Sequence, residues 1–145
     1  MRDDAASRAG STSCGGGFAS TLGLRVLSRS VTDIAVEMPV TEALVQQYGY
    51  LHGGATIALL ETAASLGAVG TADADETPFG VHIDIRHRRS ARAGQVVTGY
   101  ARLKDEMPSN AEHPDRRTQL WEVRALDESG AVISDGIIEI RIVRG

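Results

Sequence analysis

The longest apolar stretch of the chain, residues 53–70, predicts a single long helix. Alanine and leucine dominate this stretch, and both have high helix propensity. Glu61 is its only charged residue. A helix of this length extends roughly 27 Å by the standard α-helical rise. Because the stretch is apolar on nearly every side, we expect the helix to be buried at the centre of the domain.

Apolar and polar side chains alternate on both sides of this stretch, which predicts strands. Two strands are expected before the helix and four after it, near residues 22–27, 34–38, 81–85, 95–103, 120–126 and 132–143. Consecutive strands with short connections indicate an antiparallel sheet. One apolar helix covering a strongly curved sheet gives an α+β fold. The charged segment 104–117 is long for a connection, so we expect a mobile or functional loop there.

Composition and charge place the chain among ordinary globular proteins. Of its 145 residues, 42% are hydrophobic and 23% are charged. Residues 1–17 are polar and rich in glycine and serine, which predicts a disordered tail before a single domain at 18–145. A net charge of −4 argues against nucleic-acid binding, and no stretch is apolar enough for a membrane span. A single cysteine, Cys14, and the lack of a signal-peptide pattern predict a cytoplasmic protein without an intrachain disulfide.

Two polar side chains interrupt the apolar helix. Glu61 and Ser65 are four residues apart, so they lie on one face. A carboxylate in a buried helix is unfavourable unless it is paired or opens to a cleft. A structural glutamate that a neighbouring strand satisfies is therefore the alternative to a functional one.

The start of the helix offers a second functional feature. His52 precedes Gly53 and Gly54, and we expect Gly49 and this glycine pair to allow turn angles that other residues resist. Free backbone N–H groups and the positive end of the helix dipole collect at this position. Together with Glu61, the helix start predicts a place for a developing oxyanion and a carboxylate that attacks a carbonyl or activates water.

The distance between these two features predicts a shared site. Gly53 and Glu61 are separated by about 12 Å along the helix, by the standard rise. One chain cannot easily offer both groups to a single carbonyl. We therefore expect the active site to combine two subunits.

The spacing of these residues resembles that of the hot-dog-fold acyl-CoA thioesterases. The resemblance rests on Gln46, Gly49, the run His52-Gly53-Gly54-Ala55, Glu61 and Ser65, and it extends over residues 20–143. The PaaI-like group, with the glutamate-type hydroxybenzoyl-CoA thioesterases, matches best. The resemblance implies a curved antiparallel sheet wrapped around one long central helix. It also implies hydrolysis of a thioester, delivered by CoA or an acyl-carrier protein, to a free acid and a thiol.

The resemblance implies a catalytic role at each matching position. Glu61 acts as the nucleophile or as the general base for water, and the Gly53 N–H polarises the thioester carbonyl. His52 positions the turn or contacts the substrate. Gln46 helps to hold the carbonyl or the attacking water, and Ser65 orients water or the carboxylate.

The resemblance further implies a substrate-binding set, which consists of Tyr48, Tyr50, Leu51, Gly54, His87 and Arg89. The first three are expected near the acyl pocket. Arg89 is expected to pair with a CoA phosphate, because guanidinium binds phosphate in a bidentate way; a solvated basic strand end is the alternative. Arg116, Arg117 and Thr118 fall where the family contacts the pantetheine arm or the nucleotide.

Neither a cofactor nor a metal is expected, and CoA enters only as part of the substrate. His82 and His113 have no metal-like spacing to each other or to carboxylates. Trp121 is expected in the core or at an interface. Family precedent implies a homo-oligomer, at least a dimer with shared sites, and a tetramer as its full assembly.

Two rival functions share this fold. The first is a non-catalytic module that binds or senses acyl-CoA, and the second is a hydratase-type enzyme. Glu61 and Ser65 argue against a pure binding module. The absence of an Asp/His pair at hydratase spacing argues against the second rival.

Overall fold

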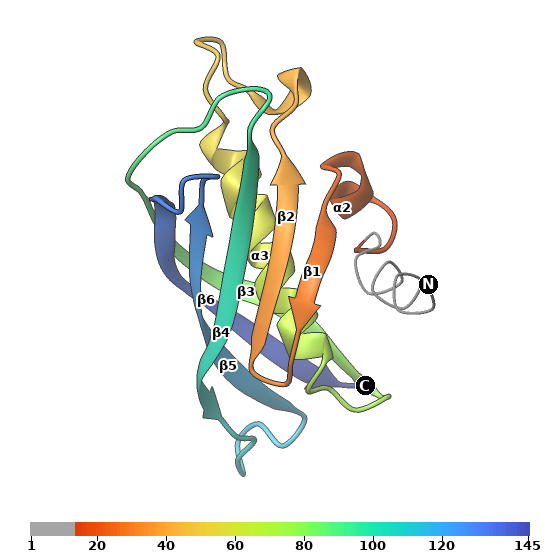
Figure 1. Cartoon of the computed structure of the whole chain (residues 1–145). Helices are drawn as coiled ribbons and strands as arrows, with labels where there is room; N and C mark the ends of the chain where they lie inside the picture. The colour runs from red at the N-terminus through yellow and green to blue at the C-terminus, as the bar shows by residue number, and fades with distance from the viewer. Residues whose placement is uncertain (1–13) are drawn as a thin grey trace.

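The computed structural model describes residues 14–145, and its central element is α3 (Gly53–Val69). A six-stranded antiparallel sheet curves around this helix (Figure 1). The strands are β1 (Arg25–Arg29), β2 (Asp33–Pro39), β3 (Glu76–His87), β4 (Val96–Met107), β5 (Arg116–Leu126) and β6 (Val132–Arg144). Their spatial order is β1-β2-β4-β5-β6-β3, so β1 and β3 are the two edges. The predicted α+β class and the order of two strands, one helix and four strands are confirmed.

Two short helices accompany these elements within residues 14–145. α2 (Phe18–Thr21) precedes β1, and the 3₁₀ helix η1 (Glu42–Leu44) leads toward α3. The predicted tail of residues 1–17 falls mostly outside the described residues. Its last part contains Cys14, which packs partly buried against the core, and this burial raises the pKa of the thiol. No helix within residues 14–145 combines the length and apolarity needed to span a membrane.

The core lies between the concave face of the sheet and one side of α3. Leu59, Leu60 and Ala63 of the helix are fully buried there, as is Trp121 of β5. A Cβ atom on Gly67 would lie 2.5 Å from the Trp121 ring, so only glycine lets the helix approach this close. The prediction of Trp121 as a core residue is confirmed.

The expectation that α3 is buried on nearly every side is wrong for the single chain. The side that the sheet covers less is only half-buried, although it carries Ala58, Leu66 and the exposed Val69 besides Glu61 and Ser65. Within one protomer the sheet covers one side of the helix, and hydrophobic periodicity does not tell whether the other side is covered by the same chain or by another. This half-buried side therefore belongs to a surface.

Strand β3 is longer and more exposed than the sequence suggested. It begins at Glu76 rather than near residue 81, and it pairs only with β6. Phe79, Val81 and Ile83 are 55%, 42% and 38% exposed, so the predicted apolar face of this strand is not buried in the protomer. The edge position also explains why Pro78 is tolerated within the strand. Alternation identified the strand but could not identify its place in the sheet.

The predicted long loop at residues 104–117 is strand at both of its ends. β4 continues to Met107 and β5 begins at Arg116. The register of the two strands shifts between Leu103 and Asp105, and their pairing then continues to Met107 opposite Thr118. The connection is therefore reduced to residues 108–115. Glu106 and Arg117, two of the charged residues that suggested a loop, form an ion pair across the strands.

Candidate active site

The first turn of α3 presents an unpaired backbone donor. His52 is the N-cap, and its Nδ1 accepts a hydrogen bond of 2.8 Å from the Gly54 N–H. The His52 carbonyl oxygen accepts from the N–H groups of Ala55 and Thr56. The Gly53 N–H has no acceptor within residues 14–145. A free donor thus remains at the positive end of the helix dipole.

The two glycines of this turn serve a steric purpose rather than the predicted conformational one. Neither has a positive φ, whereas Gly49 in the preceding loop does, at 86°. A Cβ on Gly53 would lie 2.8 Å from His87 Nε2, and a Cβ on Gly54 would lie 2.9 Å from His52 Nδ1. The prediction of unusual turn angles is therefore confirmed at Gly49 and wrong at the glycine pair. Both positions lack a side chain because an imidazole occupies that space.

His87 reaches the helix start from the end of β3. Its Nδ1 lies 2.7 Å from Ser134 Oγ, and the two residues face each other in the β3–β6 pairing. Ser134 is only 1% exposed, whereas His87 is open to solvent. The sequence singled out His87 but not Ser134, because nothing near Ser134 in the chain signals a partner forty-seven residues away.

The loop before α3 is shaped by Gln46. Its side-chain oxygen accepts from the Tyr48 N–H at 2.5 Å and lies 3.5 Å from the Tyr50 nitrogen. The Tyr50 hydroxyl accepts from Arg92, whose guanidinium also lies 4.4 Å from the centre of the Tyr50 ring. Tyr48 is strongly exposed, whereas Leu51 is buried in the core. The expected place of Tyr48, Tyr50 and Leu51 near an acyl pocket stays a prediction.

Glu61 lies halfway along α3 on its half-buried side. Its carboxylate rests directly over Gly80 of β3, where any Cβ would collide with Oε1. No hydrogen bond or ion pair satisfies this carboxylate within the described part of the chain. β3 therefore provides space for Glu61 and no polar partner. Gly80 was not predicted as a site residue, although a lone glycine within a strand often marks such a close approach.

Beside Glu61 an apolar pocket of about 330 Å³ opens on the half-buried side of α3. Glu61 and Ser65 are its polar groups together with Thr62, and the other lining residues are Phe18, Ala58, Leu66 and Val69. The predicted shared face of Glu61 and Ser65 agrees with this placement. Phe18, which is 66% exposed, was missed by sequence reasoning because it directly follows the glycine-rich segment.

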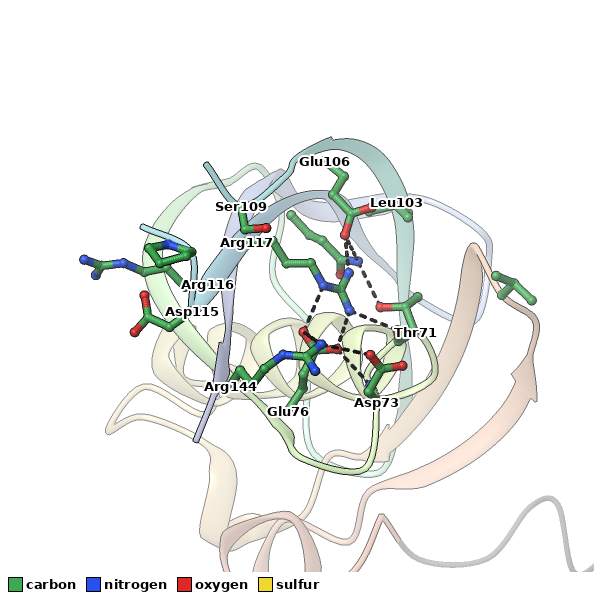
Figure 2. Close-up of a pocket in the computed structure, with 13 residues that line it drawn as sticks. Thr71, Asp73, Glu76, Leu103, Glu106, Ser109, Asp115, Arg116, Arg117 and Arg144 are labelled. Carbon is green, nitrogen blue, oxygen red and sulfur yellow. Dashed lines mark hydrogen bonds and ion pairs between the residues drawn. The ribbon is translucent and has the colours of Figure 1, made fainter. Parts of the chain in front are cut away.

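A larger cavity, of about 380 Å³, lies beyond the C-terminal end of α3 (Figure 2). Arg117 forms ion pairs there with Glu76, at 3.1 Å, and with Glu106. The Arg117 guanidinium is the main reason that the pKa of Glu76 falls to about 2, and a hydrogen bond from the Asp73 N–H adds to the effect. Gln119 is fully buried and joins Glu106 to the Trp121 indole.

Several further charges that line this cavity pair with one another. Arg144 pairs with Asp73 and Asp75, and it lies 3.8 Å from Glu76. Figure 2 shows these side chains converging on each other, while Arg116 points to one side. Arg117 therefore belongs to a network of ion pairs within the chain, and its expected contact with the pantetheine arm or nucleotide stays a prediction. Arg89 lies on the exposed segment that follows β3, at the opposite end of that strand.

Comparisons with known proteins agree with this geometry. Residues 48–134 match the family model described as the thioesterase superfamily. The chain is 35% identical over 113 residues to a 1,4-dihydroxy-2-naphthoyl-CoA hydrolase from Listeria monocytogenes, a match that covers 78% of this chain and 85% of the relative.

Solved structures are also similar to this chain. A Staphylococcus aureus protein superposes with a TM-score of 0.80 and 28% identity, covering 89% of this chain and 100% of that one. A Haemophilus influenzae thioesterase superposes with a TM-score of 0.77 and 25% identity, and the match covers 90% of this chain and 85% of that one. The six-stranded sheet around one long helix is the hot-dog fold of these neighbours, and the chain belongs to the thioesterase superfamily.

Proposed function

We propose that the protein hydrolyses acyl-CoA thioesters, with Glu61 as the nucleophile or as the general base for water. The unpaired carboxylate beside an apolar pocket is the observation that carries this proposal. A half-buried carboxylate without a partner is unfavourable for stability, so its retention calls for a function. If Glu61 attacks the thioester carbonyl directly, the C–S bond breaks, the CoA thiolate leaves, and water then hydrolyses the resulting mixed anhydride to the free acid. If Glu61 instead takes a proton from water, the hydroxyl adds to the carbonyl, the C–S bond breaks, and the free acid and the thiol form in one stage.

The start of α3 supplies the electrophilic part of the proposed site. The free Gly53 N–H and the helix dipole favour negative charge, which develops on the carbonyl oxygen during attack. His52 holds this turn through its cap, and Gln46 shapes the loop that leads into it. In the proposal, these two side chains act by positioning the donor.

Variants of the S. aureus relative support the choice of Glu61 and Gln46. Its solved structures include a glutamate-to-alanine and a glutamine-to-alanine variant, and the second is described as a thioesterase. The two substituted positions are the same number of residues apart as Gln46 and Glu61. We propose corresponding roles here.

Each proposed site combines two protomers. Eight residues of helix separate Gly53 from Glu61, about 12 Å by the standard rise, which is too far for one carbonyl. The half-buried side of α3 and the exposed apolar residues of β3 provide the surface for a second copy. An unpaired edge strand readily pairs with another strand, so we propose a homodimer joined at β3 that assembles further into a tetramer.

An aromatic acyl group is the first substrate class to test. Relatives from L. monocytogenes, Escherichia coli and Arabidopsis thaliana are named as acting on 1,4-dihydroxy-2-naphthoyl-CoA. The pocket beside Glu61 is mainly apolar, and the exposed ring of Phe18 forms part of its wall. Stacking on this ring would favour a flat aromatic acyl group over a short aliphatic one.

Thiol release from a panel of acyl-CoAs tests the proposal. The panel should contain aromatic, short aliphatic and long aliphatic thioesters, with the same acyl groups on an acyl-carrier protein. We expect turnover, fastest with an aromatic acyl-CoA. Tight binding without thiol release, measured by calorimetry on the same panel, would instead assign the protein as an acyl-CoA-binding module.

Mixing two inactive variants tests the shared site. Glu61→Gln removes the carboxylate, and Gly53→Pro removes the N–H and also places a Cβ against His87. Refolding the two together should restore activity, because each mixed dimer keeps one intact site. Confirmed mixed dimers without activity would contradict a site shared between protomers.

A further inference from the structure

We propose that His87 is a catalytic residue whose Nε2–H donates a second hydrogen bond to the thioester carbonyl oxygen, beside the Gly53 N–H. The inference rests on the proposed thioesterase function and adds a residue role to it. The imidazole lies against the first residue of α3, since a Cβ on Gly53 would be only 2.8 Å from Nε2. In the single chain the His87 side chain is also exposed.

The hydrogen bond with Ser134 selects the tautomer that this role requires. Ser134 Oγ lies 2.7 Å from His87 Nδ1 and has no other hydrogen-bond partner within residues 14–145. A buried hydroxyl normally donates its proton, and Nδ1 is the acceptor that this hydroxyl meets. When Nδ1 accepts, the neutral imidazole carries its proton on Nε2. The nitrogen at the helix start is then a donor.

The imidazole is also held in place by its backbone. The N–H groups of Arg88 and Arg89 both point to the Ile133 carbonyl oxygen, at 2.7 and 3.2 Å. The Arg88 side chain forms an ion pair of 2.7 Å with Asp135. These contacts fix the end of β3 against β6 on both sides of Ser134. A donor fixed before the substrate arrives needs no reorganisation when charge develops on the oxygen.

The absence of a side chain at Gly53 follows from the same arrangement. Alanine has a higher helix propensity than glycine, and Gly53 has no positive φ that would require glycine. What excludes a Cβ at this position is the His87 ring. The glycine thus keeps a backbone donor and an imidazole donor together at one helix start.

Variants of His87 test the inference by thiol release. His87→Ala should lower kcat about 10²- to 10³-fold with little change in KM, which is typical of losing one oxyanion donor. His87→Gln keeps an N–H donor on a side chain of similar reach and should recover part of the rate. His113→Ala, in the exposed loop 108–115, is the matched control and should retain wild-type kcat. Melting temperatures of all variants establish that they fold.

A double variant separates a positioning role of Ser134 from a structural one. Ser134→Ala should lower kcat less than His87→Ala, because the imidazole stays near the helix start without a fixed tautomer. The variant that lacks both side chains should be no slower than His87→Ala alone, since Ser134 acts through His87. Additive losses would contradict the proposed tautomer.

Complementation assigns His87 to one half of the shared site. His87→Ala refolded with Glu61→Gln should recover about a quarter of wild-type activity, because half of randomly assorted dimers are mixed and one of their two sites is intact. His87→Ala refolded with Gly53→Pro should recover none, since both changes fall on the same half-site. Recovery in the second mixture would overturn the inference.

The controls also distinguish the two proposals from each other. A wild-type protein that releases no thiol from any acyl-CoA would overturn the proposed function and this inference together. An active wild type with a folded His87→Ala variant of unchanged kcat would overturn the inference alone.

Discussion

The two ends of helix α3 carry polar groups in opposite states. At the C-terminal end, Arg117, Glu76 and Arg144 form ion pairs with one another or with nearby carboxylates. At the N-terminal end, the Gly53 N–H has no acceptor among the described residues, and His87 uses only one ring nitrogen. Glu61, between the two ends, also has no polar partner in the described structure. Yet the cavity at the C-terminal end, of about 380 Å³, is larger than the pocket beside Glu61, of about 330 Å³.

The pairing of the polar groups, rather than the size of the pocket, therefore distinguishes a stabilising polar cluster from a functional one. The paired charges at the C-terminal end, among which Glu76 is the most buried, join β3 to β5 and β6. Donors and carboxylates without partners are unfavourable for folding and available to a substrate. Substitutions at the two ends should therefore affect different measurements.

The largest expected effect is on turnover, at Glu61. Glu61→Gln should keep the fold and slow thiol release at least about 100-fold, because the amide is neither nucleophilic nor basic. Glu122→Gln, on an exposed position of β5, is the matched control and should retain activity. Ordinary kinetics for Glu61→Gln would remove Glu61 from the mechanism, and a lower melting temperature with an unchanged rate would make it a structural residue.

At the opposite end, the largest expected effect is on stability. Arg117→Met should lower the melting temperature by several degrees, because it leaves Glu76, whose side chain is 5% exposed, without its main cation. Arg102→Met breaks an exposed pair with Asp33 and should change the melting temperature little. The specific activity of folded Arg117→Met should match that of the wild type. Equal melting temperatures for the two variants would show that the network does not stabilise the fold.

The same network predicts how stability depends on pH. The pKa of Glu76 is about 2 in the folded protein, against an ordinary value of 4.5. A lowered pKa in the folded state means that ionised Glu76 stabilises the protein above about pH 4.5, and that this contribution is lost as the pH falls toward 2. Denaturant midpoints of wild type and Glu76→Gln should differ at neutral pH and converge over that range. A difference that stays constant across this range would contradict the pairing.

The smallest expected effect concerns the helix cap. His52→Ala removes the acceptor for the Gly54 N–H and should reduce the free energy of unfolding by about 1 kcal/mol. His52→Asn offers another capping acceptor and should restore most of that stability. Denaturant unfolding measures both variants. If His52→Asn is as unstable as His52→Ala, the imidazole contributes more than a cap.

The sequence by itself determined the elements of this protein and the spacing of its chemistry. Helix α3 follows from a continuous run of strong helix formers, and the strands follow from alternation, which are both local properties. Glu61 and Ser65 share a face because they are four residues apart on one helix. His52 and Gly53 stand at its start for the same local reason.

The tertiary structure alone decided which groups meet across the sheet. The His87 ring lies against Gly53, and Ser134 forms a hydrogen bond with His87. The Glu61 carboxylate lies over Gly80, and Arg117 forms an ion pair with Glu76. Each of these contacts joins separate elements, so no periodic pattern in the chain encodes it. The edge position of β3 could not be predicted either, because alternation indicates the two faces of a strand but not its neighbours in the sheet. Burial and pairing depend on those neighbours, and the neighbours exist only once the chain has folded.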